Sequence, residues 1–453
     1  MRRIASAGQT AGGLERLTDQ SGRPRLDRSL SGSHRYAGAV TRSDLTPPRL
    51  RVQTAPIDDP GPLLSRLPVD DAYAWVRHGD GLVGYGEVVR HKPESIAEAD
   101  AWFRDLAAAT EVVSELAEPP AGAGLMAFGS FVFDPENTAG QSVLVVPQVV
   151  IGRRNGQSWL TWIGTDAPKP PVVTAPTPPD DVRFSPGGLD EVAWPAVVAE
   201  TVARIGRGDV GKVVLARDVV AEARSDLDPR WLAGRLAATY PQCWTFLVDG
   251  LVGASPEMLV KREAGLALSR VLAGTIRRTG DDNRDLNLAA ALAKSSKDLQ
   301  EHEYAVASVA RALAPFCSGM NVPEAPYILG LPNVLHLATD VTGVAEPGVS
   351  ALALAAALHP SAAVCGTPTD QARALIAELE HLDRARYAGP VGWIDAQGNG
   401  EWAIALRCGL ISETDPRQIR LFAGCGIVAG SDPAAELAES VAKLVPMRDA
   451  LLG

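Results

Sequence analysis

The sequence predicts a mixed α/β (α+β) protein, in which helices and strands follow one another along most of the chain. The chain has 453 residues, which is long enough to bury a large core. Its hydrophobic content of 46% and charged content of 21% are ordinary for a globular protein. From Leu189 onward, segments with helical periodicity alternate closely with strand-like runs. Length alone allows two or three domains, although α/β folds of this size also form single units.

Charge and cysteine usage exclude several classes of function. The net charge of −11 argues against a nucleic-acid partner and against an anionic membrane surface. No run approaches 18 apolar residues, so we expect no membrane span. The five cysteines are odd in number and form no CxxC pair, which favours the cytoplasm and argues against a zinc–thiolate site.

Residues 1–50 differ from the remainder of the chain. They contain nine arginines and only four acidic residues, so this segment carries +5 and the rest carries −16. Ser and Gly are frequent and hydrophobic periodicity is poor, which predicts a disordered extension. It has no apolar core of a secretory signal, although its composition resembles a transit peptide. A start codon assigned too far upstream would give the same pattern, and we favour a plain tail.

The first structured part, residues 51–164, predicts a meander of strands with one helix packed on it. A pair of strands would turn at Gly79-Asp80-Gly81. The helix has amphipathic spacing over residues 95–116, and three strands follow it. The predicted strands span residues 72–79, 82–91, 124–134, 142–154 and 158–165.

A proline-rich connection separates this part from the next. Residues 168–179 contain six prolines, which predicts an exposed segment without regular structure. It fits either a domain boundary or a long surface loop, because the strands on both sides need partners.

The second part, residues 189–453, reads as dense alternating structure. Residues 244–263 resemble a hairpin-like pair, and residues 266–278 a strand that enters a glycine turn. Thr367-Pro368-Thr369-Asp370 is expected to cap the helix over residues 371–385. The other predicted helices span residues 194–208, 229–241 and 285–316, and the other strands residues 212–223 and 334–345.

The C-terminal end combines three signals for binding an acidic small molecule. Arg407 interrupts an apolar run and could hold a carboxylate in a bidentate manner. A glycine turn at Gly424-Cys425-Gly426 could offer free amides to an anion, although such a turn is usually only a tight turn. The last helix would begin with Asp432 as N-cap and Pro433 at its first position.

Two pairs of acidic residues could hold a hard cation. Asp298 and Glu301 share one face of a predicted helix, and Glu436 and Glu439 share a face of the last helix with Lys443. Such pairs together could bind Mg²⁺ and its anionic ligand, although this spacing usually marks only a solvated helix face.

Three further side chains could carry proton chemistry. Lys212 opens a strand, where a desolvated lysine could act as a base and a solvated one would only end the strand. Glu257 follows a Gly-Ala-Ser-Pro turn, where a buried glutamate could act as an acid and an exposed one would be a loop residue. His336 alternates with apolar neighbours, as a core histidine also would.

Taken together, nine motifs resemble the chorismate-utilising enzymes, and isochorismate synthases most closely. The resemblance is strong over residues 189–453 and weak over the variable part, residues 51–188. The motifs occur in the family's order: KVVLARD, GASPEML, LAGTIRR, SSKDLQEHEY, LHLAT, HPSAAVCGTP, AELEHLDRARYAGPVGWID, GNGEWAIALRC and LFAGCGIVAGSDPAAELAESVAKL.

The resemblance implies one large catalytic domain over residues 51–453. In the family fold, two antiparallel sheets pack face to face with helices outside, and the active site lies between them. It implies chorismate as substrate, Mg²⁺ as the metal and no organic cofactor, and we expect a cytoplasmic monomer. Glu301 and Glu439 would be the main Mg²⁺ ligands, with Asp298 and Glu436 further out. The substrate would be held by Gly274, Thr275, His336, Tyr387, Arg407, Gly424, Gly426 and Lys443.

The resemblance also implies a mechanism. Lys212 would be the base that activates water for attack at C2, and Glu257 the acid that protonates the departing C4 hydroxyl. Family members that use ammonia commonly carry glutamine at the position of Lys212. Lysine therefore favours water as nucleophile and argues against formation of anthranilate or aminodeoxychorismate.

Two alternatives stay open. Tyr387 resembles the salicylate-forming relatives, which eliminate pyruvate from isochorismate, whereas Leu337-Ala338-Thr339 resembles isochorismate synthases. Ser296 stands where some siderophore-pathway relatives carry an acid, and this affects no catalytic role.

A catalytically inactive binding subunit would require that a catalytic position be lost, and every matched position is present. The pathway, whether menaquinone, siderophore or salicylate, is not readable from the chain.

Overall fold

The protein was analysed as a computed structural model that describes residues 48–331 and 334–453. The predicted N-terminal extension lies outside the described residues as far as residue 47. The described residues belong to one compact unit. Among them, no helix is long and apolar enough to cross a membrane.

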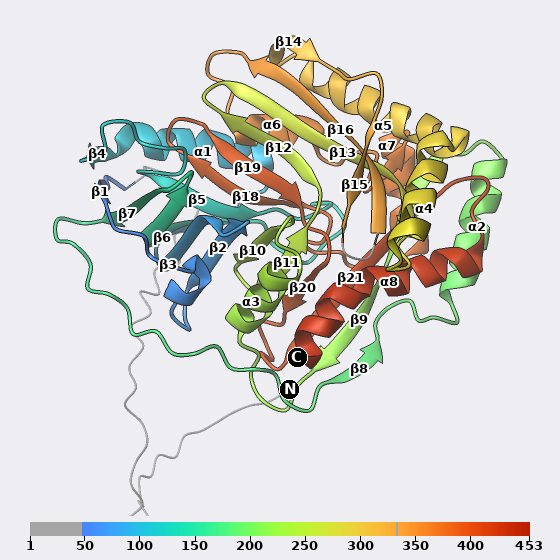
Figure 1. The fold of residues 1–453 in the computed structure, drawn as a ribbon, viewed down its shortest axis with the longest axis horizontal. Coiled ribbons are helices and arrows are strands. Elements are labelled where there is room, and N and C mark those ends of the chain that lie inside the picture. Colours follow the sequence, from blue (N-terminus) through green and yellow to red (C-terminus); the bar gives the residue numbers. More distant parts are fainter. Residues whose placement is uncertain (1–47, 332–333) are drawn as a thin grey trace, which may run out of the picture. The chain divides into compact units, whose positions relative to one another are not determined.

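Helices are distributed along the whole described chain (Figure 1). Their bounds are η1 Leu63–Arg66 (a short 3₁₀ helix), α1 Ile96–Ala109, α2 Trp194–Gly206, α3 Pro229–Thr239, α4 Asp282–Lys294, α5 Ser296–Leu313, α6 Ala351–Leu358, α7 Thr369–Leu379 and α8 Pro433–Leu452.

Strands alternate with these helices. Those of the N-terminal part are β1 Arg51–Pro56, β2 Ala72–Arg77, β3 Asp80–His91, β4 Glu111–Ser114, β5 Met126–Ser130, β6 Val143–Arg154, β7 Gln157–Ile163 and β8 Arg183–Pro186. The others are β9 Lys212–Glu222, β10 Trp244–Val248, β11 Leu251–Ser255, β12 Met258–Glu263, β13 Leu266–Arg277, β14 Cys317–Asn321, β15 Tyr327–Gly330, β16 Val334–Ala345, β17 Gly366–Thr367, β18 Pro390–Asp395, β19 Gly400–Ile404, β20 Cys408–Ile411 and β21 Gln418–Ile427.

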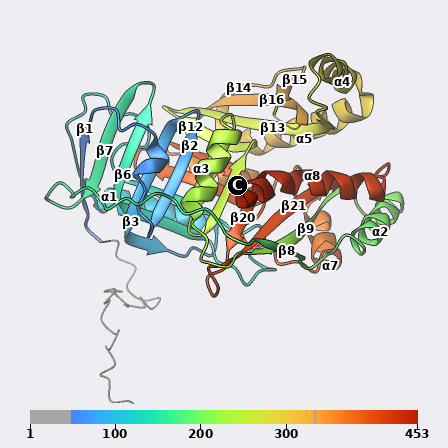
Figure 2. The same cartoon turned by 60° about the horizontal axis from the view of Figure 1, so that its bottom comes forward.

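The strands form one continuous hydrogen-bonded sheet that divides at β6. One edge of β6 pairs with β3, and its other edge is shared by β7 and β5. From β3 a first leg continues through β2, β10, β11, β20 and β21 to β9, and from β5 a second leg runs through β18, β19, β12 and β13 to β16. Among the described strands, every pair except the parallel β1 and β4 is antiparallel. Figure 2 shows the leg with β13 and β16 above the leg with β9 and β21.

The predicted fold class is confirmed, and the structure adds one detail to it. The two layers are joined through β6, so they are legs of one sheet and not two separate sheets. A strand of twelve residues can do this because its two halves pair with different neighbours along one edge.

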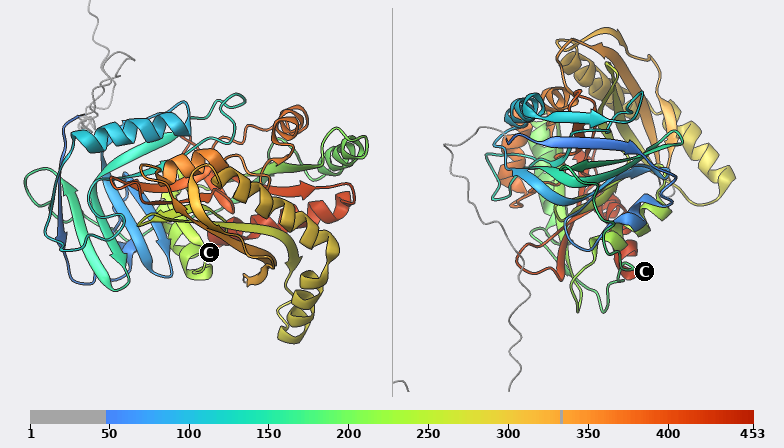
Figure 3. Two further views of the ribbon diagram at one scale, coloured as in Figure 1. Left: turned by 90° about the horizontal axis from the view of Figure 1, so that it is seen from above. Right: turned by 90° about the vertical axis from the view of Figure 1, so that its left-hand side faces the viewer.

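Helices cover the outer faces of the two legs. On the second leg, α6 packs on β12 and β19 and lies between α1 and α5 (Figure 3). On the first leg, α8 packs on β21, and α3 packs on β10 and β11. Apolar side chains from both legs and these helices form the core, with Trp194, Phe246 and Trp402 among its fully buried members.

The predicted strands of residues 51–164 and the helices over residues 194–208 and 229–241 are confirmed, but three helix predictions, those over residues 285–316, 95–116 and 371–385, were too long. The predicted helix over residues 285–316 is two helices, because Ser295 has an extended backbone and caps α5 by accepting a hydrogen bond from the Asp298 amide. The helix over residues 95–116 ends at Ala109, and the chain then forms β4 beside β1. The β-branched Val112 and Val113 favour that strand.

The predicted glycine turn at Gly424-Cys425-Gly426 is wrong, because both of its glycines lie inside a strand, and a third glycine, Gly274, also lies within a strand. Gly274 forms a bulge in β13 with φ of +71°, which glycine adopts without strain. Gly424 and Gly426 lie within β21, whose backbone pairs with β9 along its whole length. The amides of that segment therefore belong to a strand and not to a free turn.

The remaining differences concern strand number and one helix cap. Residues 244–263 form three strands, β10 to β12, in place of a pair. The α7 helix ends at Leu379, six residues before the predicted end, and no side chain caps its start because Pro368 occupies the cap position. The capping prediction for the last helix is confirmed, since the Asp432 side chain accepts from the Ala435 amide and Pro433 follows it.

Candidate active site

A cavity of about 270 Å³ lies between the two legs of the sheet. Its walls come from β9 and β21 on one side and from β13 and β16 on the other, with α8 closing one flank. The structure brings thirteen of the fourteen predicted site residues to this cavity: Lys212, Glu257, Gly274, Thr275, Asp298, His336, Tyr387, Arg407, Gly424, Gly426, Glu436, Glu439 and Lys443. The fourteenth, Glu301, lies in α5, but its side chain is outside the described residues.

Lys212 and Glu257 reach the cavity from different legs. Lys212 is the first residue of β9, and its side chain is half-buried. Glu257 lies in the short link between β11 and β12, where its carbonyl accepts a hydrogen bond of 3.1 Å from the Ile404 amide and its own amide donates to Ser255 Oγ. That link holds the glutamate rigidly, because both of its backbone polar groups are bound.

Burial raises the pKa of Glu257 to about 7, and the cations Lys212, Lys443 and Arg407 counteract part of that shift. Among the described residues, no group forms a hydrogen bond or ion pair with its carboxyl oxygens. A buried carboxyl in this state holds a proton near neutral pH and can give it to a bound molecule.

Arg407 is a cation without a counter-ion among the described residues. It stands between β19 and β20 with φ of +50°, a left-handed conformation that side chains other than glycine rarely adopt. Burial lowers the pKa of its guanidinium, since no carboxylate lies close enough to offset the loss of water. A buried, unpaired guanidinium is suited to a carboxylate of a ligand.

Lys443 provides a second cation, which is tied to the helix that carries it. Its Nζ lies 2.6 Å from Glu439 Oε1 and donates to the Gly424 carbonyl at 2.8 Å. Burial disfavours the charged ammonium, but the Glu439 carboxylate outweighs this effect, so the pKa of Lys443 is above its usual value. Burial likewise acts against ionised Glu439, and Lys443 outweighs it, which leaves the pKa of Glu439 low.

Carboxylates from α5 and α8 line the same cavity. Asp298, Glu436 and Glu439 all line it, and the oxygens of the last two lie within 4.8 Å of Cys425 Sγ and of one another. Burial raises the pKa of Cys425 to about 12, so the thiol keeps its proton. The available donors are therefore carboxylate oxygens, which fit a hard cation such as Mg²⁺ and give zinc no thiolate.

The bulge at Gly274 brings β13, β16 and α5 together. A Cβ at this position would lie 3.2 Å from Asp298 Cβ, so glycine allows the close approach of α5. Beside it, Thr275 Oγ1 lies 3.0 Å from His336 Nδ1. Burial lowers the pKa of His336 to about 3, with help from Arg407 and Lys443, so the imidazole is neutral, and its Nε2 has no partner among the described residues.

Tyr387 forms the wall opposite this bulge. Its ring stacks on Phe422 with centroids 5.0 Å apart, and a Cβ on Gly424 would come within 2.9 Å of its hydroxyl. Glycine at 424 thus makes room for the tyrosine, which is a different role from the predicted anion-binding turn. Burial raises the pKa of Tyr387, so the hydroxyl remains a hydrogen-bond donor.

Sequence reasoning missed Arg384, which also lines the cavity. Its guanidinium donates to the Val364 and Val214 carbonyls and pairs with Glu380, a carboxylate that also accepts from the Ala216 amide. Arg384 therefore braces the wall with four of its five N–H donors. Its place in the motif HLDRARYAGP was the available signal, but only the fold reveals this bracing.

The cavity thus combines a rigid buried acid, a lysine, an unpaired guanidinium and a group of carboxylates. The lysine and the guanidinium are two positive groups, and together they suit a small molecule that carries more than one carboxylate. An acid and a lysine on different walls suit proton transfers at two positions of that molecule.

Comparison with known proteins agrees with this chemistry. The model of the chorismate binding enzyme family matches residues 174–452. The chain is 41% identical over 266 residues to isochorismate synthase DhbC of Bacillus subtilis, an alignment that covers 56% of this chain and 66% of that protein. It is 38% identical over 263 residues to isochorismate synthase EntC of Escherichia coli, with 57% and 66% covered. The matched region thus spans slightly less than two thirds of these curated relatives.

The fold is also found among solved structures. MenF, the menaquinone-specific isochorismate synthase from Escherichia coli, superposes with a TM-score of 0.75 at 25% sequence identity. The superposition covers 90% of this chain and 95% of MenF. The resemblance that the nine motifs indicated is therefore confirmed by sequence and by fold.

Proposed function

The chain belongs to the chorismate binding enzyme family, and we propose that it is an isochorismate synthase, an isomerase that interconverts chorismate and isochorismate. The observation that carries this proposal is Glu257, a buried acid that shares one cavity with Lys212. Lysine at position 212 supports water as the nucleophile, since the resemblance implies that family members which use ammonia commonly carry glutamine there.

The reaction needs two proton transfers of opposite direction. Lys212 takes a proton from water as the water oxygen forms a bond to C2. Glu257 gives its proton to the C4 hydroxyl, which leaves as water while the ring double bond shifts between the two carbons. One water enters and one leaves, so the reaction is balanced and reversible. The pKa of Glu257 near 7 supports its part, because the group can both hold and release a proton at neutral pH.

Binding is assigned to the charged groups of the walls. Arg407, with no counter-ion among the described residues, would pair with one substrate carboxylate. Thr275 and the neutral His336 would face the ring, and Tyr387 and Lys443 would offer donors beside Arg407. Gly274 and Gly424 let Asp298 and Tyr387 approach the strands that line the cavity.

Glu439 would hold Mg²⁺ together with Glu301, the other main ligand that the resemblance implies, and Asp298 and Glu436 would lie further out. Bound there, the ion would supply positive charge for a substrate carboxylate. The ammonium of Lys443 keeps Glu439 ionised, which favours metal binding at neutral pH.

The decisive experiment is a product assay. Purified protein is incubated with chorismate and Mg²⁺, with EDTA as control, and products are separated by liquid chromatography. We expect an equilibrium mixture of chorismate and isochorismate that EDTA abolishes, and at least about 100-fold lower turnover for Lys212→Ala. Full activity of Lys212→Ala would contradict the mechanism, and absence of turnover in the wild type would favour a binding subunit.

Salicylate synthase is the second candidate, and Tyr387 is the observation that favours it. The tyrosine lies in the cavity wall with its hydroxyl beside Gly424. Salicylate-forming relatives also carry tyrosine at this position. Salicylate and pyruvate as products would select this alternative, and their absence at neutral pH would remove it. The names of the relatives span several pathways, and we assign none.

We also expect a monomer in the cytoplasm. All five cysteines are free and buried, which supports a reducing compartment. Analytical ultracentrifugation would check the oligomeric state.

A further inference from the structure

Glu257 separates the main cavity from a second, much smaller one. The small cavity has a volume of about 20 Å³ and lies under α5, with Ala305 and Val309 of that helix on one side and Ser269 of β13 on the other. Glu257 and Ser361 are also among its lining residues. The acid therefore faces the substrate cavity on one side and this small cavity on the other.

The small cavity has the size of a site for one water molecule, and its mainly apolar lining contains four polar side chains: Glu257, Ser269, Arg270 and Ser361. A water needs roughly 10–15 Å³ and two to four polar partners. Ser361 Oγ is buried and has no hydrogen-bond partner among the described residues. Ser269 is also buried, and the carboxyl of Glu257 likewise has no partner among the described residues. Each of these groups costs free energy unless it is hydrogen-bonded, and one water can serve them together.

We propose that this cavity binds one water between Ser361 Oγ and the Glu257 carboxyl, and that Ser361 is a positioning residue for the acid. The inference deepens the proposed function, because it rests on Glu257 as the proton donor. Glu257 lines this small cavity as well as the substrate cavity, so one of its carboxyl oxygens can meet the water.

The water fixes which oxygen of the acid carries the proton. A protonated carboxyl has one O–H donor and one carbonyl acceptor. A water on the inner side donates to the acceptor oxygen, so the O–H turns toward the substrate cavity. When Glu257 gives its proton to the departing hydroxyl, the same water stabilises the carboxylate through the hydrogen bond that it already makes. The water keeps its own protons throughout.

The charges around Glu257 come from several elements and stay in place in this scheme. The other charged or titratable side chains of the described residues that line the substrate cavity or the small one are Lys212 of β9, Arg270 of β13, Asp298 of α5, His336 of β16, Arg384 and Tyr387 between α7 and β18, Arg407 between β19 and β20, and Glu436, Glu439 and Lys443 of α8. None of them is changed when Ser361 is replaced.

The kinetic test replaces Ser361 by valine, which removes the hydroxyl and fills the cavity. We expect Ser361→Val to lower kcat about tenfold with little change in KM for chorismate, since the substrate contacts are intact. The alkaline limb of the kcat/KM profile should move up by about half a pH unit or more, because the carboxylate loses a stabilising hydrogen bond. Ser361→Thr, which keeps a hydroxyl, should recover most of the lost rate. Ser308→Ala, at an exposed position of α5, is the matched control.

A high-resolution crystal structure of the wild type provides the direct readout. We expect density for one water between Ser361 and Glu257, and its loss in Ser361→Val. An unchanged kcat and alkaline limb in Ser361→Val, or a small cavity without water in the wild type, would overturn the proposal. Ser361→Ala provides the kinetic comparison if the valine variant does not fold.

Failure of the proposed function would be recognised separately. If the wild type forms no isochorismate, the pKa of Glu257 can still be followed by NMR of a carboxyl-labelled protein. A higher Glu257 pKa in Ser361→Val than in the wild type would then support the water, and equal values would refute it.

Discussion

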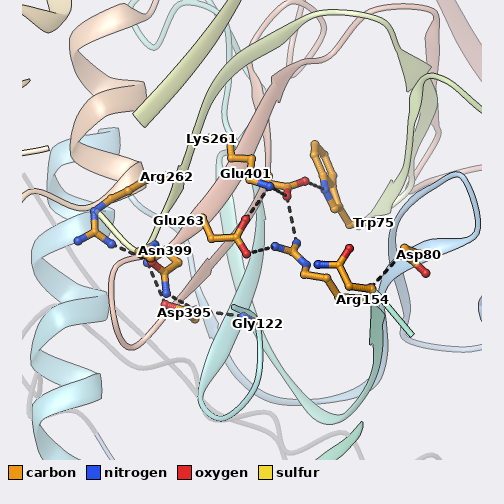
Figure 4. A network of polar contacts seen from close by, with 12 residues as sticks. Trp75, Asp80, Gly122, Arg154, Lys261, Arg262, Glu263, Asp395, Asn399 and Glu401 are labelled. Carbon is orange, nitrogen blue, oxygen red and sulfur yellow. Dashed lines mark hydrogen bonds and ion pairs between the residues drawn. The ribbon is translucent and has the colours of Figure 1, made fainter. Parts of the chain in front are cut away.

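The two ends of the β12–β19 strand pair carry buried carboxylates in opposite settings. At one end, Glu257 precedes β12 and has no hydrogen-bond partner for its carboxyl among the described residues. At the other end, Glu401 accepts from Trp75 Nε1 at 2.8 Å and pairs with Arg154 and Lys261 (Figure 4). Glu257 and Glu401 are each 8% exposed, so the difference does not come from burial.

This contrast teaches that partners decide what a buried carboxylate does. Glu263, which belongs to the network of Figure 4, is partly buried, but hydrogen bonds and charges from Lys261 and Arg154 outweigh that burial, and its pKa is lowered. Glu257 faces cations only at longer range, so burial dominates and its pKa rises. One end of the strand pair is thus a structural ion network, and the other is a proton donor.

The largest effect should come from removing the acid. We expect Glu257→Gln to lower isochorismate formation by at least about 100-fold, because the amide cannot donate a proton to the departing hydroxyl. The matched control, Glu263→Gln, should keep turnover within about threefold, since it acts through its ion pairs and not on the substrate. Product formation measured by chromatography checks both. Equal losses of turnover in the two variants would contradict the different roles assigned to Glu257 and Glu263.

The next effect compares two arginines. Arg407→Lys should raise KM for chorismate about 10- to 100-fold, because a lysine cannot make the bidentate contact with a carboxylate. Arg154→Lys should leave KM unchanged and lower the unfolding free energy by about 1–3 kcal/mol, since Arg154 bridges Glu263 and Glu401. Steady-state kinetics and urea denaturation separate these outcomes. A normal KM in Arg407→Lys would contradict the assigned role of Arg407.

Stability should depend on pH in a way that is specific to Glu257. Its pKa is about 7 in the folded protein against 4.5 in the unfolded chain, so the folded state binds the proton more tightly. The stability that this group contributes is therefore full below about pH 4.5 and is lost as the pH rises to about 7. We expect Glu257→Gln to be more stable than the wild type by about 2–3 kcal/mol at pH 8, and the advantage to shrink toward pH 5. A wild-type protein that is the more stable one at pH 8 would argue against a buried, uncompensated acid.

The smallest effect concerns two glycines with positive φ. Gly274→Ala and Gly265→Ala should each lower stability by about 1 kcal/mol, because alanine is strained at φ of +71° and +84°. A new Cβ at 274 meets Asp298 at 3.2 Å, whereas nothing lies within 4 Å at 265. Only Gly274→Ala should therefore raise the Mg²⁺ concentration needed for half-maximal activity. Equal Mg²⁺ requirements in both variants would show that the bulge at Gly274 does not affect the carboxylates that would hold the metal.

Much of the local structure could be predicted from the sequence. The start of α8 follows from Asp432 and Pro433, whose cap hydrogen bond and fixed φ are local properties. The break at Ser295 could not be predicted in the same way, because the residues around it also suit one continuous helix. In the folded chain Ser295 caps α5, and α5 packs against β13 and β16.

The glycines are a second example of structure that local sequence patterns do not predict. A Gly-x-Gly sequence is compatible with a tight turn and with a strand that something large must approach. At Gly424 the large group is Tyr387, which is 37 positions earlier in the chain and arrives only when β21 pairs with β9. No local pattern could have distinguished these possibilities.

The sequence by itself determined the kinds of residue available, most of the helices and strands, and the family to which the ordered motifs belong. Only the tertiary structure decided that Lys212, Glu257 and Arg407 line one cavity, and that Glu257 is buried without a partner among the described residues. The physical reason is that the protonation of a carboxyl depends on lost water and on nearby charges. For Glu257 these charges come from β9, α8 and the β19–β20 link, which only the folded chain brings together.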